Sequence, residues 1–93
     1  METIILKDVV GGSFSSSDGY GLYCILKPYF FCDQEVLVSL EGFSVMSSSF
    51  FNSSFGELIE EFGIEKFKHI IKFVSLTRSQ ANLIRRYVEF HLL

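Results

Sequence analysis

The sequence predicts a small α/β domain in which three strands alternate with three helices. Strand-like runs of β-branched residues alternate with stretches of helical periodicity, in the order β-α-β-α-β-α. Such alternation is typical of a mostly parallel sheet, here a small single layer with the helices packed on it. The 93 residues, 48% of them hydrophobic, suffice for one core, so we expect a single domain spanning 1-93.

The first strand is predicted from Thr3 to Val10, with Gly11 and Gly12 ending it. A helix then follows from about Asp18, capped by Ser16 or Ser17. Its apolar stripe recurs at helical spacing and consists of Leu22, Ile25, Leu26 and Tyr29. Two features weaken this helix: the glycines Gly19 and Gly21 in its first turn, and Pro28, which we expect to end or kink it.

The second strand is predicted from Val36 to Phe43. Three consecutive serines then form what we call the serine turn (Ser47, Ser48 and Ser49). The second helix is predicted from Phe51, and Gly63 suits the position just after its end, because glycine tolerates a positive φ. The buried face of this helix is predicted to comprise Phe51, Phe55, Leu58, Ile59 and Phe62.

The third strand is predicted between Ile70 and Leu76, and its continuous hydrophobicity suits a parallel strand covered on both faces. Thr77 and Gln80 have the spacing of a capping box, which opens the last helix. This helix carries a core stripe of Ala81, Ile84 and Val88, and a second apolar line of Leu83, Tyr87 and Phe90. The second line is either part of one broad buried face or a second interface.

The amino-acid composition excludes several classes of function. Eleven phenylalanines are too many for so small a core to hide, so we expect exposed apolar surface that meets a protein partner. The net charge of -3 argues against nucleic-acid binding, and no apolar run is long enough for a membrane span. Cys24 and Cys32 lack metal-site spacing; we expect Cys24 to be buried, no metal or other cofactor, and a reducing, cytoplasmic location.

Three interpretations of the serine turn remain open. One serine can be a helix N-cap; the turn can be a phosphorylation or anion-binding site; or a serine can be a nucleophile. The third is poorly supported, because the GxSxG and P-loop motifs are absent and nothing marks His69 or His91 as a catalytic base. We therefore expect a protein that is not an enzyme.

The central run LEGFSVMSSSFFNSSFGELIEEFG resembles the STAS-like domain family, a group of small, largely uncharacterised bacterial proteins. The matching positions are Gly42, Val45, Ser48, Ser49, Phe50, Asn52, Phe55, Gly56 and Leu58. The upstream SFSSSDGYGL and the downstream FKHIIKFVSLTRSQANLIRRYV are similar to the flanking parts of that family. The resemblance covers most of the chain and implies a STAS-like fold.

The related anti-sigma-factor antagonists carry a serine, usually preceded by aspartate, that a partner kinase phosphorylates. The resemblance puts Ser48 at the phosphorylated position, with Ser47 in place of the aspartate and Phe50 in place of a glycine. It implies a regulatory, signal-transduction module whose partner is a histidine-kinase-type ATPase. The residues expected to bind the partner or act as a switch are Ser47, Ser48, Ser49, Asn52 and Ser53. The alternative is an assembly domain that forms homo-oligomers through Leu83, Tyr87 and Phe90.

Overall fold

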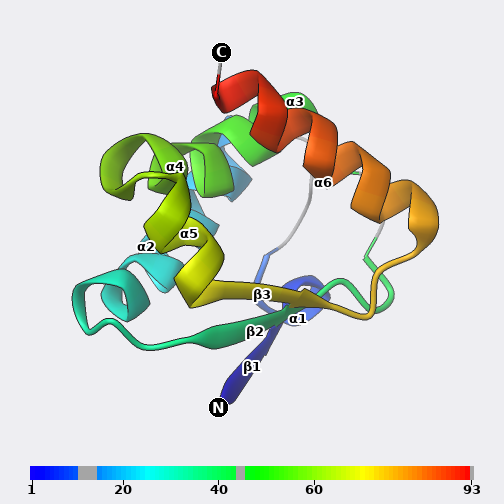
Figure 1. Cartoon of the computed structure of the whole chain (residues 1–93). Coiled ribbons are helices and arrows are strands. Elements are labelled where there is room, and N and C mark those ends of the chain that lie inside the picture. Colours follow the sequence, from blue (N-terminus) through cyan, green and yellow to red (C-terminus); the bar gives the residue numbers. More distant parts are fainter. Residues whose placement is uncertain (11–14, 44–45, 93) are drawn as a thin grey trace.

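Three parallel strands form the sheet of this computed structural model, which describes residues 1–10, 15–43 and 46–92. The strands β1 (Glu2–Ile5), β2 (Val36–Ser39) and β3 (Ile71–Val74) lie in the order β1-β2-β3. In register, Ile4 lies beside Val38, and Val38 lies beside Phe73. The larger helices cover one face of this sheet (Figure 1). The predicted α/β class with a mostly parallel sheet is confirmed.

The helices connect the strands in the expected order, and the described residues form two short helices in addition to the three that the sequence predicts. The first connection holds the single turn α1 (Leu6–Val9) and the long helix α2 (Ser16–Phe31). The second holds α3 (Ser48–Phe51), the π-helical turn η1 (Asn52–Gly56), α4 (Glu57–Phe62) and α5 (Ile64–Ile70). The last helix, α6 (Arg78–His91), follows β3. Because α3, η1 and α4 follow one another without a break, we call them together the central helix.

The core lies between the sheet and the helices. The largest fully buried side chains include four phenylalanines, Phe30, Phe50, Phe51 and Phe55. Each large apolar side chain contributes about 1.5–3 kcal/mol by leaving water. The predicted buried face of the central helix is confirmed, with Phe62 only half-buried at its end. Phe31 and Phe90 are exposed, as expected for a chain with more phenylalanine than its core can hold.

The strands are shorter than predicted. The first ends at Ile5, where the backbone turns into α1 and Leu6 becomes fully buried, so tertiary packing overrides the β-propensity of Val9 and Val10. The second ends at Ser39, before the turn at Gly42, whose φ is +69°. The expectations for Gly11, Gly12 and Val45 lie outside the described residues.

Pro28 does not end α2, so the prediction that the helix ends at this residue is wrong. The helix continues to Phe31 with Pro28 inside it. Proline has no N–H to donate to the backbone carbonyl one turn earlier, but Pro28 is exposed, so water can bond that carbonyl. After the helix the chain turns at Asp33, whose φ of +54° lets Gln34 N–H donate to the carbonyl of Tyr29 at 2.9 Å. The N-cap is Ser15, one residue before the predicted candidates.

The helix α5 was not predicted, and the third strand is correspondingly short. Ile64, Phe67 and Ile70 have helical spacing, but the helix starts directly after Gly63, without a loop to separate it from α4. The prediction that this strand is covered on both faces was wrong. Thr3 is exposed and Leu37 and Lys72 are half-buried on the face of the sheet opposite to the core.

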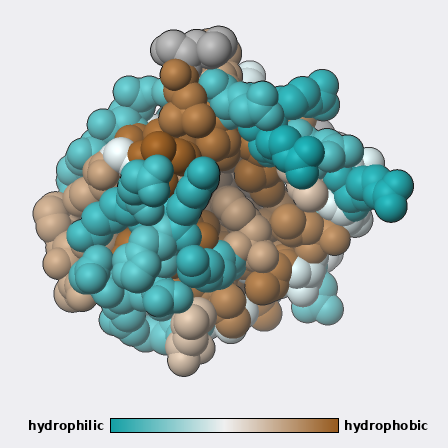
Figure 2. Space-filling model, viewed as in Figure 1, coloured by the Kyte–Doolittle hydropathy of each residue, from teal (hydrophilic) through white to brown (hydrophobic). Residues whose placement is uncertain are grey.

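The helix α6 packs at the edge of the helical layer and leaves a groove of about 360 Å³ between itself and the α5–β3 segment. Figure 2 shows apolar side chains gathered in the hollow between these elements. Phe67, Phe73 and Val88 line it, with Lys68 and Arg85 among its charged residues. One side of α6 is therefore only partly packed against the rest of the domain.

Candidate functional site at the serine turn

The serine turn lies where the chain enters the central helix. Ser47 has extended backbone, and its hydroxyl accepts a hydrogen bond from the N–H of Phe50 at 3.1 Å. This confirms the N-cap interpretation for Ser47. Because the cap precedes Phe51 by four residues, the helix begins one turn earlier than predicted. Ser48 and Ser49 are exposed in the first turn, so their hydroxyls are accessible to another molecule.

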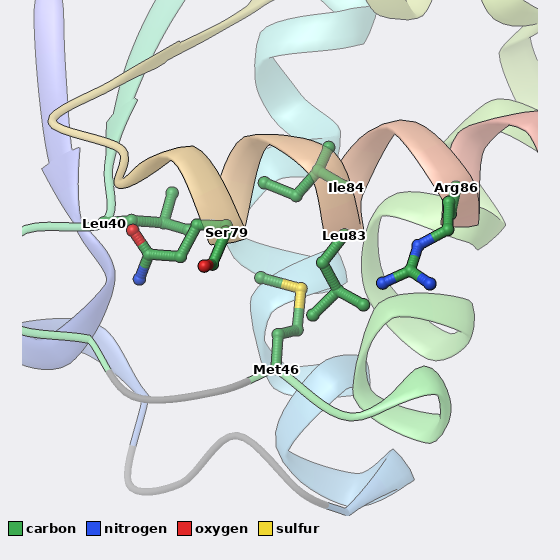
Figure 3. Close-up of a pocket in the computed structure, with 7 residues that line it drawn as sticks. Leu40, Met46, Ser79, Leu83, Ile84 and Arg86 are labelled. Atoms are coloured by element: carbon green, nitrogen blue, oxygen red, sulfur yellow. The ribbon is translucent and has the colours of Figure 1, made fainter.

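The chain before the serine turn is fixed to α6. The hydroxyl of Tyr87 donates to the carbonyl of Met46 at 3.1 Å. The side-chain Nε2 of Gln80 donates to the carbonyl of Phe43, also at 3.1 Å. Figure 3 shows Met46 facing Leu83 on α6. These contacts hold the base of the turn in place while its two exposed serines remain at the surface.

Gln80 makes side-chain hydrogen bonds to two separate parts of the chain. Its backbone N–H donates to Thr77 Oγ1 at 3.1 Å, and its side-chain Oε1 accepts from the N–H of Thr77 at 2.9 Å. This is the predicted capping box, and it is confirmed. Since the other end of the same amide bonds Phe43, the start of α6 and the loop after β2 are positioned together.

The central helix contains a π-helical turn directly after the serine turn. The hydroxyl of Ser54 donates to the carbonyl of Phe50 at 2.7 Å, and that of Ser53 donates to the carbonyl of Ser49 at 2.9 Å. These hydroxyls satisfy carbonyl groups near a distorted part of the helix. Ser54 is buried and Ser53 half-buried, so Ser53 does not share the open surface of Ser48 and Ser49.

The helix α2 approaches this region very closely at Gly19. A Cβ atom on Gly19 would lie 2.0 Å from Ser53 Oγ and 2.5 Å from the carbonyl oxygen of Phe50. Neither distance is compatible with a side chain, so the two helices touch through backbone. This explains a glycine that the sequence analysis treated only as a weak point of α2.

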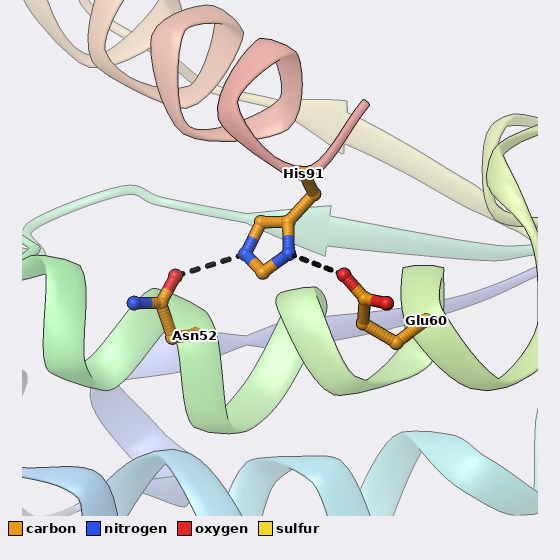
Figure 4. A network of polar contacts seen from close by, with 3 residues as sticks. All are labelled: Asn52, Glu60 and His91. Carbon is orange, nitrogen blue, oxygen red and sulfur yellow. Dashed lines mark hydrogen bonds and ion pairs between the residues drawn. The ribbon is translucent and has the colours of Figure 1, made fainter. Parts of the chain in front are cut away.

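His91 links the end of α6 to the central helix (Figure 4). Its Nδ1 lies 3.0 Å from Glu60 Oε1 and its Nε2 lies 2.9 Å from Asn52 Oδ1. Because a carboxylate only accepts hydrogen bonds, Nδ1–H is the donor to Glu60. The imidazole also fills the space over Gly56, where a Cβ atom would lie 2.6 Å from Nε2. Asn52, an exposed candidate site residue, is thus oriented by His91.

A second polar cluster joins α2 to α4 on the outside. Tyr23 donates a short hydrogen bond to Glu61, and Lys27 Nζ lies 3.2 Å from Glu61 Oε2. The hydrogen bond from Tyr23, with help from Lys27, lowers the pKa of Glu61 below its ordinary value. The same bond to Glu61 raises the pKa of Tyr23.

The three apolar residues predicted as a second interface do not form one exposed face. Tyr87 is half-buried and donates a hydrogen bond to Met46. The centroid of the Tyr87 ring lies 5.1 Å from that of Phe51. Leu83 is half-buried beside Met46, and of the three only Phe90 is exposed, at 67%. The sequence shows all three at helical spacing, but it does not show that a tyrosine hydroxyl has an internal partner.

The structure places neither histidine on the serine turn. His69 is exposed on α5, and both ring nitrogens of His91 bond other residues. Within the described ranges, no three histidine, cysteine or acidic residues gather as a metal site. Cys24 is exposed, which corrects its predicted burial, because it lies on the outer side of α2 between Leu22 and Leu26.

Sequence reasoning found the exposed serines but missed Gly19 and the pairing of His91 with Asn52. The only available signal for Gly19 was its place inside a predicted helix, and nothing local distinguishes it from Gly21, where an added Cβ would meet no atom within 4 Å. None of the helices in the described part of the chain is long and apolar enough to cross a membrane.

Comparison with known proteins yields one match. No curated protein and no solved structure matched the chain. The family model described as "STAS-like domain of unknown function (DUF4325)" matches residues 22–81. This range includes most of α2, the serine turn, the whole central helix and the start of α6. The chain therefore belongs to the STAS-like domain family, whose function is unknown.

Proposed function

We propose that this domain is a non-enzymatic regulatory module that docks a protein partner through the serine turn and the outer face of the central helix. The observation that carries the proposal is the contrast within the turn: Ser47 is used as a cap, whereas Ser48 and Ser49 are exposed in the next two positions. A helix start that is fixed to α6 by Tyr87 presents these hydroxyls in a defined geometry. Preformed surfaces lose less conformational entropy on binding.

The partner class follows from resemblance to the anti-sigma-factor antagonists. By that resemblance the partner is a histidine-kinase-type ATPase, and Ser48 is the residue it phosphorylates. Exposure of Ser48 at a helix start supports this choice, because a phosphate there meets unsatisfied N–H donors and the positive end of the helix dipole. A phosphoserine would add nearly two negative charges to the docking surface and change the affinity for the partner.

The test compares the capture of partner proteins by tagged wild-type protein and by Ser48→Glu from cells of the source organism. We expect Ser48→Glu to lose the captured protein. Ser17→Glu is the matched control, because Ser17 is also exposed in the first turn of a helix, α2, away from the serine turn. Equal capture by all three proteins would contradict docking at the turn.

Mass measurement of the intact protein isolated from the same cells tests the switch directly. We expect a phosphorylated fraction that is absent from Ser48→Ala. A phosphorylated fraction of unchanged size in Ser48→Ala would place the modification elsewhere.

A further inference from the structure

A small pocket lies beside the serine turn, between α6 and the residues that follow β2. Its volume is about 210 Å³. Leu40 and Met46 form one wall, and Leu83 and Ile84 of α6 form the other (Figure 3). Small-molecule and cofactor sites usually measure about 300–1,000 Å³. This pocket is smaller than that range, which suits one apolar side chain.

The pocket is held open by the rest of the structure. Leu40 and Met46 are 2% and 3% exposed, so they belong to the core as well as to the wall. The hydrogen bonds from Gln80 to Phe43 and from Tyr87 to Met46 join its two sides. A side chain that enters therefore meets a preformed apolar surface and does not have to order it.

The mouth of the pocket is positively charged. Arg86 is exposed at the mouth, and Figure 3 shows its guanidinium turned back toward Leu83. Within the part of the chain that the structure describes, Arg86 forms no ion pair. The same helix also exposes Arg78, whereas its exposed acidic residue, Glu89, lines the other groove together with Arg85. A guanidinium binds a carboxylate through two parallel hydrogen bonds, so this surface complements an acidic segment.

We propose that this pocket binds a leucine-sized side chain from an acidic segment of the partner protein, with a neighbouring carboxylate on Arg86. The inference rests on the proposed function, because it identifies the chemistry of the partner that covers the serine turn. Met46 directly precedes Ser47, so the pocket adjoins the serine turn and one partner can contact both.

The chain has a natural reporter for this site. It contains two methionines, Met1, which is exposed, and Met46, which lines the pocket. Methyl-labelled methionine therefore gives one signal from the pocket and one internal control. The probe is a blocked five-residue peptide with a central leucine between glutamates. We expect a saturable shift of the Met46 methyl, with a millimolar dissociation constant, and no shift of Met1.

Two control peptides separate the parts of the proposal. Replacing the central leucine by alanine removes the side chain for the pocket, and replacing the glutamates by lysines reverses the charge. We expect neither to saturate. A lysine peptide that binds as tightly as the acidic one would overturn the role of Arg86, and absence of a saturable Met46 shift with the acidic peptide would overturn the pocket.

Two variants test the same points from the protein side. Arg86→Ala should weaken binding of the acidic peptide about five- to tenfold, the usual net effect of losing one hydrogen bond. Arg85→Ala is the matched control, because Arg85 is the neighbouring arginine but lines a different groove. Its affinity for the acidic peptide should stay within about twofold of the wild type. Ser79→Phe places a larger group from an exposed position into the pocket and should abolish the Met46 shift. Unchanged binding by Arg86→Ala and Ser79→Phe would overturn the proposal.

Capture of the partner distinguishes this inference from the proposed function. If Ser48→Glu loses the partner while Ser79→Phe and Arg86→Ala keep it, the serine turn is the docking point and the pocket is not part of it. If Ser48→Glu keeps the partner while the acidic peptide still binds, the pocket exists and the turn is not the docking point. We expect all three variants to lose the partner, whereas Arg85→Ala retains it.

Discussion

The helices α2 and α6 both pack against the central helix, but by different means. At Gly19, α2 approaches so closely that its backbone touches the carbonyl of Phe50. The helix α6 meets the central helix through side chains: the ring of Tyr87 packs on Phe51, and His91 bonds Glu60 and Asn52. On its other side α6 borders an apolar groove. The comparison indicates that α2 fixes the position of the central helix through backbone contact, whereas α6 is joined to it by side chains and forms one wall of the proposed docking surface.

The largest effect is expected from closing the space at the α2 contact. Gly19→Ala should destabilise the domain by about 1–3 kcal/mol, because its Cβ would overlap a backbone oxygen that cannot move independently. Urea unfolding followed by circular dichroism measures the change. If the two helices had room to separate, the loss would be close to zero and α2 would be no more constrained than α6.

Gly21→Ala is the matched control for this substitution. Gly21 lies in the same helix, is exposed, and has no atom within 4 Å of an added Cβ. Alanine there should stabilise the domain by about 0.5–1 kcal/mol, the ordinary gain from replacing a helical glycine. The two alanines should therefore act in opposite directions, although the sequence alone gives both glycines the same character.

The corresponding substitution on the α6 side should cost less. In Gly56→Ala the new Cβ meets His91, a side chain near the end of the chain that can move away. The hydrogen bonds of His91 would be lost, and the better helix propensity of alanine offsets about 1 kcal/mol of that loss. We expect a net loss below about 1 kcal/mol, smaller than that of Gly19→Ala.

A double-mutant cycle sharpens this second prediction. In a His91→Ala background, Gly56→Ala should no longer destabilise the domain, because the side chain in its way is gone. The coupling energy between the two positions should be about 1 kcal/mol. Additive effects would show that the loss at Gly56 comes from the carbonyl of Phe51, 3.2 Å from the same Cβ, and not from His91.

The sequence predicted what depends on local pattern. Thr77 and Gln80 show a capping box by their spacing, and Gly63 marks the end of a helix, because each signal acts within a few residues. The order of strands and helices followed from periodicity. The exposed serines of the serine turn were found in the same way, from their position between a strand and an amphipathic stretch.

The sequence could not predict what depends on contacts between distant residues. Gly19 and Phe50 are 31 positions apart in the sequence. The need for a glycine at this close approach becomes visible only when the two helices are seen packed against each other. The contact of His91 with Asn52 and the pocket beside Met46 arise in the same way. The helix α5 escaped prediction for a local reason, since no loop separates it from α4.

The cap of the central helix offers an effect of similar size that separates structure from docking. Ser47→Ala removes the acceptor for Phe50 N–H and should cost about 1 kcal/mol. Ser48→Ala, one residue further and exposed, should change stability by less than about 0.5 kcal/mol. Thermal unfolding of both variants measures this. Equal losses of stability in the two variants would mean that Ser48 also has a structural role, which would weaken its assignment to the docking surface.

The smallest effect is expected from the outer polar cluster that joins α2 to α4. The pKa of Glu61 is lowered in the folded state from its ordinary value of 4.5, so its ionised form stabilises the fold. This contribution is present above pH 4.5 and is lost as the pH falls through the lower, folded-state pKa. The cluster is solvent-exposed, so the shift in melting temperature should be small.

Glu61→Gln isolates this contribution, because the amide still accepts from Tyr23 but has no charge to pair with Lys27. The variant should melt slightly below the wild type at neutral pH, and the difference should disappear on acidification below the folded-state pKa. Glu57→Gln, an exposed glutamate of the same helix, should follow the wild type throughout. A difference that persists in acid would assign the cluster's effect to hydrogen-bond geometry. In that case α2 would owe its fixed position to Gly19 and side-chain packing, without a contribution from charge.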